Sequence, residues 1–296
     1  MAVEYWRWPE EEGISTGVDC KKTASITAGV DIGAVSSKAA IMCDGELAAY
    51  SIIRTGADSK ASAQKAMDKA LKAAGLEIGD IRYIVSTGYG RANASFAKKT
   101  VTEIACHARG APYMYGPTVR TILDMGGQDT KAIKSDQYGK VLAFIMNDKC
   151  ASGTGRGIET FADMVCVPIQ DIGQMSLEVD EEPEPVSSTC VTYANSMAIQ
   201  LMRRAPKNKV LAAYCFSIAW RDYILLQRLA NQSGDGSVEK DLAITGGMAK
   251  NTGVVSRIER ELGFKALPAK KGDPQIAGAV GAAILAAEMV TSGKSR

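Results

Sequence analysis

Two cysteines lie in short polar loops directly before predicted helices, and this setting suits a thiolate that binds a metal. Cys150 lies between Asn147 and Arg156 in the run NDKCASGTGR, and Cys190 follows Ser187 in the run SSTC. A helix N-terminus favours negative charge, so it lowers the pKa of a thiol and stabilises an anionic cluster. An iron–sulfur site needs about four thiolates, whereas each loop supplies one. The two cysteines therefore indicate half of an iron–sulfur site, and a second chain would supply the other half.

A second chemistry is indicated by aspartate–glycine turns at the ends of predicted strands. The run DIGAVSSK begins at Asp31, and the run DMGGQD begins at Asp124. Backbone N–H groups in such a turn bind phosphate oxygens, and the carboxylate can hold Mg²⁺ through water. A single turn of this kind is common, but the second copy favours nucleotide binding. A third glycine turn, the run TGGMAKN from Thr245 to Asn251, suits close packing against a purine and ribose.

Two similar α/β halves are predicted to position these residues. In each half a strand ends in the Asp-x-Gly sequence and further strands follow, which implies an internal duplication. The Asp44-Gly45 pair predicts a hairpin turn, and Gly75 a helix C-cap. The predicted strands cover 26–33, 38–43, 47–53, 81–86, 122–127, 130–133, 141–145 and 242–245. The predicted helices cover 59–74, 154–164, 191–203, 211–229 and 277–289.

Composition excludes several classes of function. The 296 residues are 46% hydrophobic and 23% charged with a net charge of +2, which is typical of a globular protein and does not suggest nucleic-acid binding. No apolar run approaches the roughly 20 residues of a membrane span. Residues 1–24 lack the pattern of a signal peptide and are expected to form a flexible tail or an arm for a partner. The expected location is the cytoplasm.

The remaining cysteines are expected to be structural. The chain has seven cysteines and no CxxC pair, so a disulfide framework is not expected. Cys43, Cys166 and Cys215 lie in apolar segments and are expected to be buried. Cys106 and His107 are adjacent on a helix, where neighbouring side chains point in different directions, so a structural role is favoured over a catalytic pair.

Four motifs together resemble one protein family. They are STGYGR from Ser86, DMGGQD from Asp124, NDKCASGTGR from Asn147 and SSTC from Ser187. The chain resembles, from about 26 to about 287, the ATPase activators of 2-hydroxyacyl-CoA dehydratases and the ATPase subunits of benzoyl-CoA reductase. These belong to the acetate kinase, sugar kinase, Hsp70 and actin superfamily. The resemblance implies an α/β, duplicated actin-like ATPase with a nucleotide cleft between two lobes, 25–120 (completed by 277–296) and 121–276.

The resemblance also implies roles for individual residues. Asp31 and Asp124 would position Mg²⁺ and its waters, and Gln128, or Asp129, would orient the attacking water. The residues implied to bind the nucleotide are Gly33, Ser36, Ser37, Lys38, Gly126, Gly127, Gly153, Thr154, Gly155, Arg156, Gly246, Gly247 and Asn251. Cys150 and Cys190 would hold one [4Fe–4S] cluster together with two cysteines of a partner chain.

The extension and the short chain look most like the small ATPase subunit of benzoyl-CoA reductase. That subunit would use ATP hydrolysis to deliver low-potential electrons from reduced ferredoxin to catalytic subunits that dearomatise benzoyl-CoA. Asn195 stands where the activators have a glutamate, which favours a homologous but non-identical ATPase subunit as partner. Three alternatives remain: a homodimeric activator of a 2-hydroxyacyl-CoA dehydratase, a small-molecule kinase, and a non-catalytic actin-like assembly protein. No membrane or nucleic-acid partner is expected.

Overall fold

The structure is a computed structural model that describes residues 4–293 apart from 16, 148–150, 152 and 235. The chain divides into two compact units, each with a β-sheet and its own hydrophobic core. Unit I comprises Pro9–Ile122, Ser135–Leu142 and Pro268–Arg296, and unit II comprises Met1–Trp8, Leu123–Lys134 and Ala143–Leu267.

The sheet of unit I contains the antiparallel strands that the sequence predicts, in the order β1-β4-β3-β2-β5-β6. β5 runs parallel to β2, while β2, β3 and β4 are antiparallel to their neighbours in sequence. Asp44 and Gly45 turn the chain between β3 and β4 with φ of 50° and 86°, which is the left-handed backbone that a two-residue hairpin requires. The strands are β1 (Glu11–Ile14), β2 (Ile26–Ile32), β3 (Ser36–Cys43), β4 (Glu46–Arg54), β5 (Tyr83–Thr87) and β6 (Lys99–Thr100).

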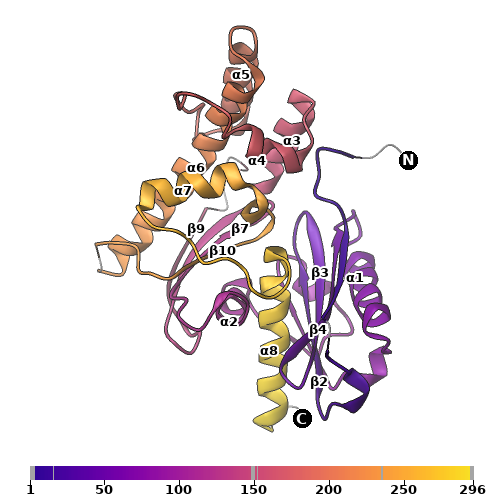
Figure 1. The fold of residues 1–296 in the computed structure, drawn as a ribbon. Helices are drawn as coiled ribbons and strands as arrows, with labels where there is room; N and C mark the ends of the chain where they lie inside the picture. Colours follow the sequence, from indigo (N-terminus) through magenta and orange to yellow (C-terminus); the bar gives the residue numbers. More distant parts are fainter. Residues whose placement is uncertain (1–3, 16, 148–150, 152, 235, 294–296) are drawn as a thin grey trace. The chain divides into compact units, whose positions relative to one another are not determined.

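Helices cover both faces of this sheet (Figure 1). α1 (Ser59–Ala74) packs against β3 and β4, and α8 (Ala277–Thr291) packs against β2 and β5 from the other side, with α2 (Glu103–Tyr115) beside it. Asp58 caps α1 by accepting hydrogen bonds from the N–H groups of Lys60 at 2.9 Å and Ala61 at 3.0 Å. Gly75 ends the helix at φ 67°. Both ends of α1 lie where the sequence predicts them.

α8 consists of small residues because it packs very closely against its neighbours. A Cβ at Gly281 would lie 1.7 Å from the carbonyl oxygen of Cys106 on α2, and a Cβ at Gly29 would lie 2.0 Å from that of Ala279. By length and mean hydropathy alone, the stretch Pro274–Thr291 could cross a membrane, but 56% of it is buried in the chain. Its apolar character is therefore explained by its place in the core of unit I.

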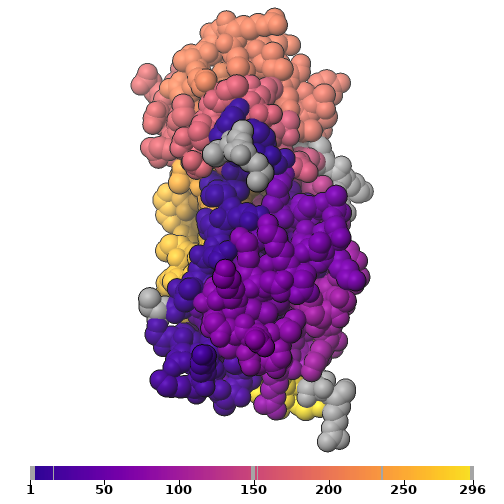
Figure 2. All heavy atoms as spheres, turned by 90° about the vertical axis from the view of Figure 1, so that its right-hand side faces the viewer, coloured from indigo at the N-terminus to yellow at the C-terminus, as the bar shows by residue number. Residues whose placement is uncertain are grey.

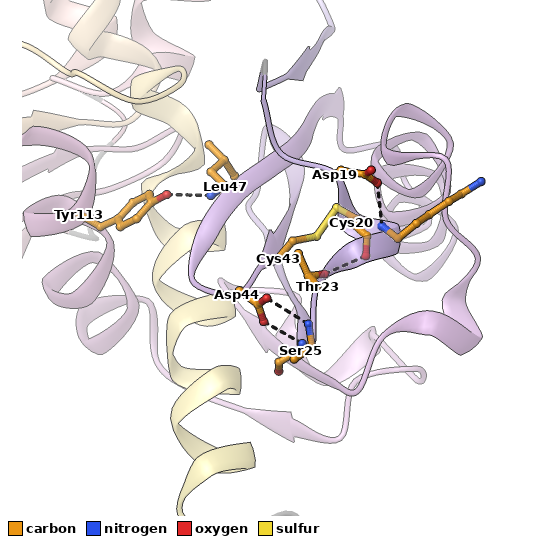
Figure 3. The surroundings of a disulfide bond; sticks show 10 residues. Asp19, Cys20, Thr23, Ser25, Cys43, Asp44, Leu47 and Tyr113 are labelled. Atoms are coloured by element: carbon orange, nitrogen blue, oxygen red, sulfur yellow. Dashed lines mark hydrogen bonds between the residues drawn. A yellow bond between two sulfur atoms is a disulfide. The ribbon is translucent and has the colours of Figure 1, made fainter.

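Cys20 and Cys43 form a disulfide, contrary to the expectation that the chain has none (Figure 3). Their Cα atoms are 5.5 Å apart. Cys43 is buried as expected, but it ends β3 and is bonded to the segment that leads into β2. Asp44 fixes the same segment by accepting hydrogen bonds from the N–H groups of Ala24 at 3.0 Å and Ser25 at 2.9 Å. The two cysteines are 23 residues apart, so only the folded hairpin reveals their proximity.

The N-terminal segment docks on its own chain, so it is neither the free tail nor the arm for a partner that we expected. β1 adds a strand to the edge of the sheet of unit I by pairing antiparallel with β4. Figure 2 shows this region in indigo on the surface, beside the purple atoms of unit I. Before β1, the Tyr5 carbonyl accepts a hydrogen bond from the Ile169 N–H at 2.8 Å, and Trp6 and Trp8 pack against the core of unit II.

Unit II has a four-stranded sheet in the order β10-β7-β8-β9. Its strands are β7 (Thr121–Met125), β8 (Thr130–Ser135), β9 (Val141–Asn147) and β10 (Leu242–Thr245). Its helices are α3 (Gly155–Val165), α4 (Ile169–Met175), α5 (Val191–Met202), α6 (Lys207–Gln232) and α7 (Thr252–Leu262). The core joins these layers, and the Phe161 ring on α3 stacks on the Tyr214 ring on α6 at 3.7 Å between centroids. α6 is longer than the predicted 211–229 because a polar turn precedes its buried part.

Candidate functional site

In unit I, the predicted phosphate-binding turn is formed at the end of β2. Asp31 is 6% exposed and stands opposite Lys38 across β2 and β3, with the lysine Nζ 3.1 Å from its Oδ2. The Gly33 N–H donates to the Ser36 carbonyl at 3.1 Å and closes the turn. A Cβ at Gly33 would lie 2.8 Å from that carbonyl oxygen, so the turn requires glycine. The turn thus places a buried carboxylate, an ammonium group and closely packed backbone together.

Unit II repeats this arrangement at the end of β7. The Gly126 N–H donates to the Asp129 carbonyl at 2.9 Å, as Gly33 does to Ser36. Lys131 lies 3.3 Å from Asp124 Oδ2 and 2.6 Å from Asp129 Oδ1, and all three side chains are buried. Lys131 was missed by the sequence reasoning. The available signal was its spacing, because each lysine comes seven residues after the strand-end aspartate in both halves.

Each strand-end aspartate is also approached by a glycine from the neighbouring strand. Gly88 follows β5 and Gly246 follows β10, and both have φ of +85°. A Cβ would lie 2.4 Å from Asp31 Oδ1 at Gly88 and 2.9 Å from Asp124 Oδ1 at Gly246. Thr245 also donates to Asp124 Oδ1 at 3.2 Å. Gly88 resembles part of an incomplete dinucleotide motif in the sequence, but in the fold it is the counterpart of the predicted Gly246.

Two predicted nucleotide ligands, Ser37 and Asn251, have structural partners, and the predicted water-orienting residue Gln128 lies at the surface. The Ser37 hydroxyl is buried, 2.8 Å from that of Thr55. The Asn251 carboxamide caps α7 by accepting the Val254 N–H at 3.0 Å. Gln128 is exposed on the turn after β7. Ser36, Gly127 and Gly247 are half-buried within their turns. The roles of all these residues in binding and catalysis stay predictions.

The segment that follows Cys150 is hydrogen-bonded directly to the predicted phosphate-binding turn of unit II. The Gly155 N–H donates to the Gly126 carbonyl at 2.9 Å, and the Arg156 N–H donates to the Gly127 carbonyl at 2.8 Å. The cysteine itself lies outside the described residues. These two backbone hydrogen bonds join the segment next to a predicted cluster ligand to a segment predicted to bind phosphate.

The other residues of this loop are held within unit II. Gly153 is buried with φ of +81°, and Thr154 is fully buried with its hydroxyl donating to the Ala151 carbonyl at 2.7 Å. Arg156 forms an ion pair with Glu159 at 3.2 Å one turn further along α3. The loop therefore has a defined backbone path into α3, in agreement with the helix start expected near 154.

Cys190 is the N-cap residue of α5, as the sequence suggested. Cys190 is half-buried, and the nearby backbone N–H groups of Tyr193 and Thr192 at the start of α5 lower the pKa of its thiol below the ordinary value of 9.0. A helix N-terminus stabilises negative charge in this way. Among the residues that the structure describes, no three histidine, cysteine or acidic side chains gather as a metal site.

The other thiols differ from Cys190. Burial raises the pKa of Cys106 to about 12 and that of Cys215 to about 11, so neither suits a nucleophile. His107 is buried beside Cys106, in agreement with a structural role. Cys166 was expected to be buried, but it is exposed. It ends α3 in the left-handed conformation at φ 52°, which turns its side chain out of the apolar pattern.

Comparison with known proteins supports one family. The model of the BadF/BadG/BcrA/BcrD ATPase family matches residues 28–286. The activator of lactoyl-CoA dehydratase from Anaerotignum propionicum is 42% identical over 88% of this chain and 97% of its own length. One of the benzoyl-CoA reductase subunits from Thauera aromatica is 31% identical over 88% of this chain and 92% of its own length.

A solved structure agrees with these relatives. The activator of 2-hydroxyisocaproyl-CoA dehydratase from Clostridium difficile, solved with bound ADPNP, has a TM-score of 0.82 and 35% identity over 92% of this chain and 98% of its own. The expected actin-like ATPase fold is confirmed. The expected benzoyl-CoA reductase subunit is less well supported than the dehydratase activator, because the activators share more identical residues with this chain. With its duplicated Asp-x-Gly turns and its cysteine loops, the chain belongs to the BadF/BadG/BcrA/BcrD ATPase family.

Proposed function

We propose that this chain is the ATP-hydrolysing activator of a 2-hydroxyacyl-CoA dehydratase. Water would cleave ATP to ADP and phosphate, and the chain would pass one electron from a low-potential donor such as reduced ferredoxin to the dehydratase. The higher identity to dehydratase activators than to the benzoyl-CoA reductase relative supports this choice. The partner in the cluster is then a second copy of this chain, in place of the non-identical subunit that Asn195 suggested. We propose the cytoplasm as its location.

The observation that carries this proposal is the pair of hydrogen bonds from Gly155 and Arg156 to Gly126 and Gly127. Phosphoryl-transfer ATPases act mainly by positioning and by stabilising charge, and cleavage of ATP would change the contacts that the turns make with its phosphates. A shift of Gly126 and Gly127 would move the bonded segment that follows Cys150. ATP hydrolysis would thereby alter the surroundings of the electron carrier.

The residues present fit the iron–sulfur cluster that the family resemblance implies. Cys190 has a lowered thiol pKa at a helix start, and thiolates are the ligands that iron–sulfur clusters use. Cys150 and Cys190 from each of two chains would hold a [4Fe–4S] cluster, which supplies the one-electron carrier. On α5 after Cys190, Tyr193 and Met197 are 68% and 44% exposed, and this apolar surface suits contact with a second copy.

The remaining site residues would act on the nucleotide. We propose that Asp31 and Asp124 orient the waters of Mg²⁺, while Lys38 and Lys131 hold these carboxylates and offset negative charge. The turns at Gly33 and Gly126 would present backbone N–H groups to phosphate oxygens. Gln128 is exposed at the unit II turn and would orient the attacking water.

A reconstitution test distinguishes the candidate functions. The anaerobically purified chain is mixed with ATP, a low-potential reductant and either a 2-hydroxyacyl-CoA dehydratase or the catalytic subunits of benzoyl-CoA reductase. We expect ATP-dependent activation of the dehydratase and none of the reductase, and loss of activation with Asp124→Asn. Activation of the reductase alone would reverse the assignment. Phosphoryl transfer to an added sugar or organic acid would instead show a small-molecule kinase.

A further inference from the structure

One arginine contacts the segments that precede both predicted cluster ligands. Arg221 lies on α6, and its Nη2 donates to the side-chain carbonyl of Asn147 at 2.9 Å. Its Nη1 donates to the carbonyl of Ser188 and lies 3.4 Å from the carbonyl of Thr189. Asn147 comes three residues before Cys150, and Thr189 comes directly before Cys190. The guanidinium therefore joins two loops whose cysteines are 40 residues apart in sequence.

The stem of the same side chain packs on the far side of the first loop. A Cβ at Gly153 would lie 2.9 Å from Arg221 Cδ, and Gly153 has φ of +81°. The position thus requires glycine both for its backbone conformation and for the approach of the arginine. Arg221 therefore attaches the described residues on both sides of 148–150, namely Asn147 and Gly153, to α6.

The part of α6 that carries Arg221 is anchored in the core of unit II. The neighbours Asp222, Leu225 and Leu226 are buried, and both leucines belong to the core of unit II. A second arginine, Arg228, lies two turns along the same helix and lines the same cavity of about 280 Å³ with Arg221, Asn147 and Thr189. Within the described part of the chain, Arg228 has no hydrogen bond or ion pair, and it is exposed. Substitution of Arg228 is therefore a matched control, because it removes the same charge from the same helix as substitution of Arg221.

We propose that Arg221 is the positioning residue that brings the two cysteine-bearing loops of each chain together. This inference rests on the proposed function, because the proposed shared cluster requires Cys150 and Cys190 to lie close together. A planar guanidinium has five N–H donors in a fixed fork and can bind two loops at once, whereas a lysine ammonium keeps the charge without that geometry. The positive charge beside these segments would also favour the reduced, more negative state of a bound cluster.

The first test uses the cluster-free chain, so it does not depend on iron. In a Cys166→Ser background, a bifunctional reagent that fluoresces only after it bridges two thiols reports the proximity of Cys150 and Cys190. Product that runs as a single chain on a denaturing gel is counted, which excludes bridges between chains. The variants are Arg221→Gln, Arg221→Lys and Arg228→Gln, each checked for its unfolding midpoint and for ATP binding.

We expect wild type and Arg228→Gln to be bridged equally fast. Both Arg221 variants should be bridged about tenfold more slowly, the factor that corresponds to one hydrogen bond to a charged group. Bridging of both Arg221 variants at the Arg228→Gln rate would overturn the proposal. If Arg221→Gln does not fold, the comparison of Arg221→Lys with Arg228→Gln decides the result.

The second test uses the iron-loaded protein and separates charge from geometry. We expect the cluster of Arg221→Gln to have a more negative reduction potential than that of wild type, and Arg221→Lys to retain most of the wild-type potential. An unchanged potential in Arg221→Gln would contradict the placement of this charge beside the cluster. Absence of iron from the wild-type protein would overturn the proposed function, while the thiol-bridging result would still decide the role of Arg221.

Discussion

At the scale of single residues, the environment of each thiol decides its chemistry. Backbone N–H groups at the start of α5 lower the pKa of Cys190, whereas burial raises that of Cys106 to about 12 and that of Cys215 to about 11. The thiolate is the reactive form. The sequence distinguishes these thiols only through their polar or apolar neighbours, and this criterion failed for Cys166, which is exposed at the end of α3.

Alkylation of the folded, cluster-free chain should show that Cys190 is more reactive than the buried thiols Cys106 and Cys215. Because its pKa is lowered, Cys190 should reach half of its maximal iodoacetamide rate below pH 9.0, the ordinary thiol value. Cys106 and Cys215 should stay unlabelled at about pH 8, because burial keeps both thiols protonated. Peptide mass spectrometry over a pH series measures each site, with exposed Cys166 as the control for access. Half-maximal labelling of Cys190 at or above the ordinary thiol pKa would contradict the described helix-start environment.

Alanine substitutions at Gly246 and Gly263 test whether the close approach of the Gly246 backbone to Asp124 is required. Gly246→Ala should abolish most ATP hydrolysis, because its Cβ would lie 2.3 Å from the Met125 carbonyl and 2.9 Å from the carboxylate. Gly263→Ala is the matched control, since Gly263 also has positive φ, at +73°, but nothing lies within 4 Å of its Cβ. The control should cost about 1 kcal/mol of unfolding free energy and keep ATPase activity. Equal activity of the two variants would refute the steric argument.

At the scale of elements, local sequence signals were sufficient where an element depends on its own residues. Asp58 and Gly75 mark both ends of α1, and Asp44-Gly45 marks the hairpin, because caps and turns act over a few residues. β1 was not predicted, because it is a short strand that is stabilised by pairing with β4, which is distant in sequence. The Cys20–Cys43 disulfide was missed for the same physical reason.

The disulfide should stabilise unit I without taking part in catalysis. A covalent link across 23 residues restricts the unfolded chain, so Cys20→Ser should lower the free energy of unfolding by about 3 kcal/mol. Cys166→Ser, an exposed substitution, should change it little. Urea unfolding with and without a thiol reductant measures both effects. A reductant-insensitive wild-type transition would show that the bond does not contribute. Loss of ATP binding by folded Cys20→Ser would show a role beyond stability.

At the scale of the whole molecule, two units carry the same small arrangement. Each has a strand-end aspartate, a lysine seven residues later, a glycine turn and a glycine from the neighbouring strand. The duplication was visible in sequence as two Asp-x-Gly runs. Lys131 was detectable from the seven-residue spacing that it shares with Lys38. The neighbouring glycine needed the sheet register, because Gly88 meets Asp31 only across paired strands. The choice between dehydratase and reductase came from the comparisons, since both branches share these motifs.

We propose that two chains share one iron–sulfur cluster through their cysteine loops. The direct measurement is iron and acid-labile sulfide per chain after anaerobic purification of wild type, Cys190→Ser and the control Cys166→Ser. We expect about two iron and two sulfide per chain in wild type and the control, which is half of a four-iron cluster, and almost none in Cys190→Ser. Iron content that is unchanged by Cys190→Ser would show that Cys190 does not bind a shared cluster.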